Sequence, residues 1–162
     1  MLKIVSGAQT GVDRAALDAA LKKNVPCGGW CPEGRKADDG IIPKLYPVQE
    51  LQGGGYNERS KKNVQESDGT VIIYFGHLSG GTEETLRYCL NENKPYLLLD
   101  GREVNTGRAA ERLIEFQSSL PGETINFAGP RASGEPQAYE YTTKVIEKFL
   151  QLHTDNNCRV HS

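Results

Sequence analysis

The sequence predicts an α/β domain with a Rossmann-like fold, that is, an open, mostly parallel sheet with helices on both faces. β-Prone segments alternate along the chain with segments of helical character. The segment 70–75 is nearly continuous in apolar and β-branched residues, which is typical of a strand buried on both faces of a parallel sheet. Glycine-rich loops follow several of these segments. The alternation favours right-handed βαβ crossovers.

The length of the chain sets the number of domains. With 162 residues, 37% of them hydrophobic, the chain has enough apolar material for one core. We therefore expect a single domain over residues 1–152 and a frayed tail over residues 153–162.

The first half of the chain contains three short expected strands and two expected helices. The strands are Leu2–Val5, a segment around Val25–Trp30, and Pro47–Leu51. The helices are an alanine-rich segment over 12–23 and a polar segment over about 56–66. Glycine and proline residues interrupt the stretch 31–47, so we expect a long irregular loop there, and loops of this length are usually functional or mobile.

The second half continues the alternation with longer elements. The expected strands cover 70–75, 95–100 and 124–127, and the expected helices cover 82–93, about 106–120 and about 137–152. In open parallel sheets the ligand site lies outside the carboxyl ends of the strands, where the strand order reverses. Functional residues are therefore expected in the loops that follow strands.

Composition argues against several classes of partner. The chain has 19 Lys+Arg and 21 Asp+Glu residues and a formal net charge of −2, so no overall basic field would hold a nucleic acid polymer. No stretch approaches the roughly 20 apolar residues that span a bilayer, and the N-terminus has no secretory pattern. We expect a cytoplasmic protein that does not bind a membrane.

The four cysteines predict neither disulfides nor a metal site. A domain of this size with its own core does not need disulfides. Cys27 and Cys31 are separated by three residues, and no second cysteine pair or suitably spaced histidine completes a tetrahedral site. We expect reduced thiols and no bound metal.

The loop after the first strand predicts an anion site. Its glycines allow close approach of a ligand, and the next helix begins with unpaired, partly positive N–H groups. The glycine spacing does not fit the dinucleotide fingerprint, and no lysine follows as a phosphate-loop NTPase requires. A tight turn with Thr10 as the helix cap is the alternative. The residues expected to bind phosphate here are Ser6, Gly7, Gln9, Thr10, Gly11 and Arg14.

Two further loops repeat this arrangement. The residues are Gly80, Gly81 and Thr82 after the strand 70–75, and Gly129, Pro130 and Arg131 after the strand 124–127. Because parallel strands end at the same edge of a sheet, these loops are expected to flank one ligand. Glu83 and Glu84 lie in a first helical turn, where acidic residues also stabilise the helix dipole without any role in catalysis.

Other charged and aromatic residues supply the remaining candidates. Arg35, next to Gly34 in the long loop, and Arg131 are candidates for a bidentate clamp on phosphate, with solvated surface charge as the alternative for Arg35. Trp30 has the chemistry to stack on a base or a pterin ring, and core packing is an equal alternative. The carboxylates considered for catalysis are Asp13, Asp39 and Glu84.

The motifs, taken in order, resemble those of the putative molybdenum-cofactor carrier family. The two long motifs are Ser6–Asp18 and Gly28–Arg35. The shorter ones are Asn63-Val64, Ser67-Asp68, Gly80–Thr82 and Asn126–Arg131, so the resemblance extends to about Leu150. The family usually has a glycine where this chain has Ala8. The extra methyl group of Ala8 slightly reduces the space in which a ligand can approach the backbone, without abolishing an anion nest.

The resemblance implies a Rossmann-like fold in the superfamily of the lonely-guy phosphoribohydrolases and the nucleotide-sensing relatives of the DNA-processing protein. It also implies molybdenum cofactor as a bound ligand and a homodimer or homotetramer. The phosphoribohydrolases use the last glutamate of a Gly-Gly-x-Gly-Thr-x-x-Glu motif, and that position falls on Thr85 here. Glu84 is one residue early, a rotation of about 100° on a helix, which counts against the same hydrolysis.

Three functional hypotheses follow. The first is a non-catalytic carrier or sensor that holds molybdopterin or a nucleotide on phosphate-binding loops. The second is a nucleotide-processing hydrolase of the phosphoribohydrolase type, and the third is a structural or partner-binding module. Several glycine-rich loops without an obvious catalytic set favour the first.

Overall fold

Five parallel strands form the central sheet of the protein. The structure, a computed structural model, describes residues 1–161. The strands are β1 (Lys3–Val5), β2 (Cys27–Gly28), β7 (Gly69–Tyr74), β8 (Tyr96–Asp100) and β9 (Thr124–Ala128). They lie in the order β2-β1-β9-β7-β8, and every neighbouring pair is parallel. The α/β fold with an open parallel sheet is confirmed.

The last strand of the chain lies in the middle of the sheet. β9 pairs with β1 on one side and with β7 on the other, so that Asn126 lies opposite both Val5 and Thr70. If the strands are counted from β9, their order becomes 3-2-1-4-5, as in doubly wound nucleotide-binding sheets. The order therefore reverses between β9 and β7, and the loops at this point are the expected place for a ligand.

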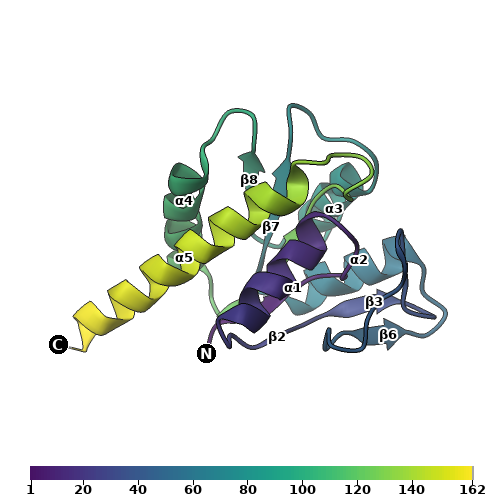
Figure 1. The fold of residues 1–162 in the computed structure, drawn as a ribbon, viewed down its shortest axis with the longest axis horizontal. Helices are drawn as coiled ribbons and strands as arrows, with labels where there is room; N and C mark the ends of the chain where they lie inside the picture. The colour runs from purple at the N-terminus through teal and green to yellow at the C-terminus, as the bar shows by residue number, and fades with distance from the viewer. Residues whose placement is uncertain (162) are drawn as a thin grey trace.

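Helices cover both faces of the sheet. α1 (Val12–Lys22), α4 (Thr106–Ser119) and α5 (Ala138–Val160) lie together on one face, and α2 (Tyr56–Glu66) and α3 (Gly80–Asn91) lie on the other (Figure 1). The main core lies under the first group, where Phe127 of β9 packs with Leu113 and Phe149. A smaller core of Val64, Ile72 and Cys89 joins α2 and α3 to β7.

The segment between β2 and α2 contains more regular structure than the sequence predicts. β3 (Trp30–Pro32) pairs in parallel with β6 (Gln49–Leu51), and β4 (Lys36–Ala37) pairs with β5 (Gly40–Ile41) in an antiparallel hairpin. The expected strand 25–30 is in fact two strands in two sheets, because Gly29, with φ of 127°, turns the chain between them. A small core packs the segment against α1, and its residues are Ala8, Leu17, Cys31, Ile42, Tyr46 and Val48.

The last helix is longer than expected. α5 continues through residues 153–160, where we expected a frayed tail. This part of the chain has neither glycine nor proline, and contacts one turn apart support the helix. The His153 ring lies 6.0 Å from that of Phe149, and Gln151 Nε2 donates to Asp155 at 3.0 Å. Among residues 1–161, no helix is long and apolar enough to cross a membrane.

Candidate functional site

A cleft of about 450 Å³ lies at the carboxyl edge of the sheet. Its walls come from α2, from the start of α3, and from the loops that follow β7, β8 and β9. Buried residues of the loop after β1 and of α1 and α2, namely Gln9, Asp13 and Arg59, line its floor. The cleft thus lies at the point where the strand order reverses, as expected for this fold.

The N-terminus of α3 opens into this cleft. The helix begins at Gly80, two residues earlier than expected, and Ser79 at its N-cap makes no side-chain capping hydrogen bond. A Cβ atom added at Gly80 or Gly81 would meet no other atom within 4 Å, so the space beside the first turn is open. Thr82 also lines the cleft. Uncapped N–H groups and the positive end of the helix dipole make this turn suited to an anion.

The N–H groups of the loop after β1, in contrast, already face an anion of the protein. The Asp13 carboxylate accepts hydrogen bonds from the backbone N–H groups of Gly7 and Gln9. It also accepts one from Arg59 Nη1 at 2.9 Å, and both side chains of this ion pair are buried. Burial raises the pKa of Asp13, and Arg59 and the two N–H groups oppose that rise without cancelling it.

Gly7 is required for this ion pair. A Cβ at Gly7 would lie 1.5 Å from Arg59 Nη1, so only a glycine lets the guanidinium lie against the loop and reach Asp13. Ala8, the next residue, has φ of 61°, a value that favours glycine.

Two buried donors at the floor of the cleft have no partner. Gln9 Oε1 accepts from the N–H groups of Thr10 at 3.0 Å and Asp38 at 2.8 Å, but Gln9 Nε2 makes no hydrogen bond within the described residues. Arg59 Nε is likewise buried and unpaired there. Since buried donors are rarely left unsatisfied, these two atoms indicate a missing acceptor in the cleft.

Arginines and an aromatic ring lie around the mouth of the cleft. The Tyr56 ring has the guanidinium carbon of Arg59 at 5.8 Å and that of Arg131 at 5.4 Å from its centroid. Arg131 Nη1 donates to Asp38 at 2.7 Å, so its charge is already paired. Arg102 lies against Gly76, and no residue of the described chain forms a hydrogen bond or an ion pair with its guanidinium.

The loop after β1 and the loop after β9 contact each other directly. Thr10 Oγ1 accepts from the N–H of Ala132 at 3.2 Å, and a Cβ at Gly11 would lie 2.3 Å from the Pro130 carbonyl oxygen. Ser6 Oγ donates to the Asp13 carbonyl at 2.8 Å. Of these loops, the residues that line the cleft are Gln9, Gly129, Pro130, Arg131, Gly134 and Glu135.

Arg14 and Arg35, which were expected to bind phosphate, instead make hydrogen bonds to other groups of the protein. Arg14 binds the Asp39 carboxylate with two hydrogen bonds, at 3.0 and 3.2 Å, and its Nε donates to the Ala8 carbonyl. The Arg14 guanidinium accordingly lowers the pKa of Asp39. The Arg35 guanidinium donates to four carbonyl groups, those of Ile42, Pro43, Tyr46 and Val48. Neither arginine lines the cleft.

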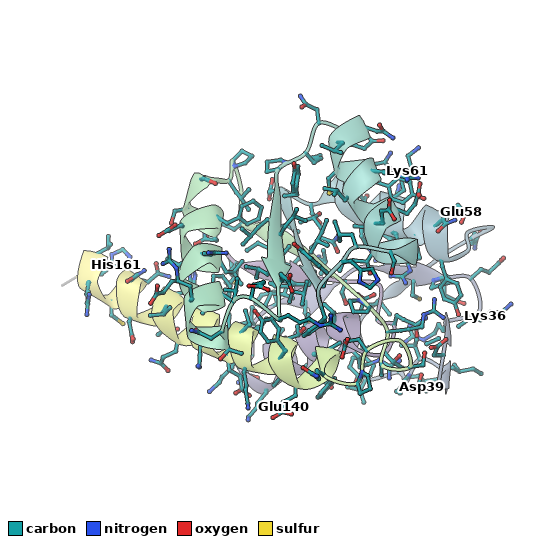
Figure 2. The ribbon with its side chains drawn as sticks, turned by 90° about the horizontal axis from the view of Figure 1, so that it is seen from above. Lys36, Asp39, Glu58, Lys61, Glu140 and His161 are labelled. Atoms are coloured by element: carbon teal, nitrogen blue, oxygen red, sulfur yellow. The ribbon has the colours of Figure 1, made fainter. Side chains whose placement is uncertain are left out.

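Trp30, Gly34 and Glu84 also lie outside the cleft lining. The backbone of Trp30 is bound to the Asn63 side chain, its indole N–H donates to Glu66, and Lys62 lies over its ring. The Gly34 N–H donates to Glu50 at 2.7 Å. Glu84 accepts from Arg87 on the exposed side of α3. Figure 2 shows Asp39 at the periphery of the molecule, with Lys36 and, at the start of α2, Glu58 on the same side.

The sequence did not identify three important cleft residues. Arg102 follows the end of β8 by two residues, so the strand-end rule that found the other loops would also have found it. Tyr56 and Arg59 come from α2, which follows a strand outside the main sheet. No local pattern predicts that this helix reaches the cleft.

The strand order and the position of the cleft define a Rossmann-like protein with a polar site at the reversal point of its sheet. The chain belongs to the Circularly permutated YpsA SLOG family, which it matches over residues 4–150. The central place of β9, last in the chain, agrees with such a permutation.

A solved structure supports the same relationship. The crystal structure of a putative molybdenum carrier protein from Syntrophus aciditrophicus SB is similar to this chain, with 42% sequence identity and a TM-score of 0.90. The match covers 93% of this chain and 95% of that one. No curated protein matches the chain. The predicted resemblance to molybdenum carriers is therefore confirmed.

Proposed function

We propose that the protein is a binding or carrier protein for a phosphate-bearing ligand with a planar ring, either molybdenum cofactor or a nucleotide. The observation that carries the proposal is the pair of unpartnered buried donors, Gln9 Nε2 and Arg59 Nε, at the floor of the cleft into which α3 opens. Donors and a helix N-terminus directed at one volume favour an anionic ligand.

The phosphate of the ligand is assigned to the first turn of α3. The open space beside Gly80 and Gly81 leaves room for it, and the unpaired Arg102 supplies a positive charge at the rim. The Tyr56 ring lines the cleft together with the guanidinium groups of Arg59 and Arg131, and this aromatic and cationic surface suits the packing of a base or a pterin. These groups divide the cleft into a phosphate end and a ring end.

The similar protein from Syntrophus aciditrophicus SB is described as a putative molybdenum carrier, and this favours molybdenum cofactor as the ligand in our proposal. In this proposal the phosphate of that cofactor binds at the first turn of α3, and its pterin ring lies beside Tyr56. No group of three or more His, Cys, Asp or Glu side chains within residues 1–161 is placed to hold a metal ion, so the proposal assigns no metal ligand to the protein.

Hydrolysis of a nucleotide is the second candidate function, and Asp13 is the observation that favours it. Among the three carboxylates considered for catalysis, Asp13 alone lines the cleft. It is paired with Arg59, however, and the position of the phosphoribohydrolase glutamate holds Thr85, whose hydroxyl donates to the Gly81 carbonyl at 2.9 Å. Release of free adenine from AMP by the purified protein would establish the hydrolase and exclude the pure carrier.

Thermal melting and calorimetry with AMP, ADP-ribose and molybdopterin test the proposal. Ligand at about 100 times its Kd adds about 2.7 kcal/mol of stability, so the melting temperature rises by about 5–10 °C. Arg102→Ala weakens binding about tenfold, because a charge-assisted contact is lost. Arg87→Ala is the matched control, since Arg87 lies on α3 outside the cleft lining and pairs with Glu83 and Glu84. No shift with any of the three ligands contradicts the proposal.

A further inference from the structure

The loop after β1 forms a small concave group of N–H donors that holds a carboxylate of the protein. Ala8 is in the left-handed conformation, with φ of 61°, and the N–H groups on either side of it, from Gly7 and Gln9, point to Asp13. Such concave groups, called nests, bind phosphate in many proteins. In this protein Asp13, in the first turn of α1, supplies the anion from within the chain.

Arg59 completes this internal anion site. Its Nη1 donates to Asp13 at 2.9 Å, and the ion pair is almost fully enclosed, with side-chain exposures of 11% for Arg59 and 5% for Asp13. Asp13 nevertheless borders the cleft. Its carboxylate therefore lies where a second phosphoryl group, next to one bound at α3, would find N–H donors.

The unpaired cations of the cleft suit one phosphoryl group and not two. Asp13 neutralises Arg59, and Asp38 neutralises Arg131. Among the Lys and Arg side chains that line the cleft within residues 1–161, this leaves Arg102, which acts together with the partial charge of about +0.5 at the start of α3. The Glu135 carboxylate also lines the cleft and adds a negative charge. A phosphomonoester carries a charge of about −1.5 to −2 at pH 7, so one such group already meets the available positive charge. A diphosphate brings a further negative charge toward Asp13, where Arg59 is already paired.

We propose that Asp13 is a specificity-determining residue that makes the cleft selective for a ligand with a single phosphoryl group over a ligand with a diphosphate. Its carboxylate fills the anion nest of the first loop and repels a second phosphoryl group. This inference rests on the proposed function, because it concerns the ligand of the same cleft.

Calorimetric titrations with AMP, ADP, inorganic phosphate and pyrophosphate test the selectivity. The wild-type protein binds AMP at least as tightly as ADP, and phosphate at least as tightly as pyrophosphate. In Asp13→Asn, which keeps the size of the side chain and removes its charge, the ratio of AMP affinity to ADP affinity falls about fivefold or more. Glu84→Gln removes a carboxylate on the exposed side of α3 and leaves the ratio unchanged.

The outcomes separate this inference from the proposed function. Binding of both nucleotides with equal ratios in wild type and Asp13→Asn overturns the role of Asp13 and leaves the carrier function standing. If the protein binds the inorganic anions but neither nucleotide, a nucleotide ligand is excluded. The ratio of phosphate affinity to pyrophosphate affinity, in wild type and in Asp13→Asn, then tests the role of Asp13. If Asp13→Asn does not fold, the wild-type comparison decides, and a tenfold preference for ADP or pyrophosphate overturns the inference.

Discussion

At the scale of single residues, charged side chains divide into those that hold the fold and those that line the cleft. Arg14 and Arg35 are bound to a carboxylate and to backbone carbonyls, whereas the guanidinium of Arg102 has no hydrogen-bond or ion-pair partner within residues 1–161. The sequence predicts both Arg35 and Arg131 as phosphate clamps, Arg35 from the long loop and Arg131 from the loop where the strand ends converge. Only the tertiary positions of the carbonyl groups around Arg35 distinguish them.

Gly7→Ala tests whether the buried ion pair at the cleft floor depends on the absence of a side chain. The new Cβ would occupy the position of the Arg59 guanidinium and separate it from Asp13. Breaking a buried ion pair costs about 3–5 kcal/mol, so we expect a loss of about 3 kcal/mol or more in the free energy of unfolding. Urea titration measures it. A loss below about 1 kcal/mol would show that Arg59 finds another position at little cost.

Asp39 gives the fold a defined dependence on acid. Arg14 lowers its pKa below the ordinary value of 3.8, so the folded state favours the ionised carboxyl. Its stabilising effect is therefore fully present above pH 3.8 and is lost as the pH falls from 3.8 through the lower folded-state pKa. Because the Asp39 side chain is 49% exposed, we expect a small effect.

The measurement for Asp39 compares wild type with Asp39→Asn by urea titration at several pH values. The variant is less stable than wild type at pH 7, and the difference between them decreases as the pH falls below 3.8. A difference that stays constant down to pH 2 would mean that the carboxylate charge does not stabilise the contact with Arg14.

At the scale of secondary-structure elements, the sequence predicts the long elements well and the short ones poorly. β7 is recognisable because a parallel strand buried on both faces needs continuous apolar residues. β8 has a similar apolar sequence, although it lies at the edge of the sheet and only Leu99 in it is buried. β4 and β5 have only two residues each, too few for any periodicity. Arg35 stabilises the following segment through side-chain to backbone hydrogen bonds, which leave no pattern in the sequence.

The first turn of α3 allows stability and binding to be separated. Gly81 lies in the helix, and a Cβ added there meets no atom within 4 Å. Gly81→Ala therefore raises the free energy of unfolding by up to about 1 kcal/mol, because alanine favours a helix over glycine. The same methyl group enters the open space assigned to phosphate, so AMP affinity falls about tenfold or more.

Gly81→Ala is expected to raise stability and to lower AMP affinity, and these opposite changes test the proposed phosphate site. Thermal melting without ligand reports stability, and calorimetry with AMP reports binding. A variant with unchanged AMP affinity would place the phosphate away from α3. Glu84→Ala, on the exposed side of the same helix, serves as a control for general effects on α3.

At the scale of the whole molecule, the order of the strands in the sheet differs from their order along the chain. The place of β9 in the sheet comes from pairing with β1 and β7, strands more than fifty residues away, and no local sequence pattern predicts such pairing. The expected homodimer or homotetramer is also a property of the whole molecule, and it stays a prediction that sedimentation equilibrium tests.

A permuted chain that begins at β9 tests whether the fold is a rearranged doubly wound sheet. Met1 and Leu2 line one surface cavity together with Leu150 and His153, so the first strand starts beside α5 (Figure 1). We expect a variant opened between Pro121 and Gly122, with a flexible linker from residue 154 to Met1, to form the same sheet. Its strand order along the chain would then be the 3-2-1-4-5 arrangement without a permutation.

The permuted variant should keep the cleft, because all the loops around it remain intact. Opening a surface loop and joining neighbouring ends changes chain connectivity more than native contacts, so we expect cooperative unfolding and AMP affinity within about threefold of wild type. Circular dichroism and calorimetry measure these properties. A molten variant would mean that the link between α4 and β9 is needed to seat β9 in the centre of the sheet, and that the native chain order contributes to folding as well as to topology.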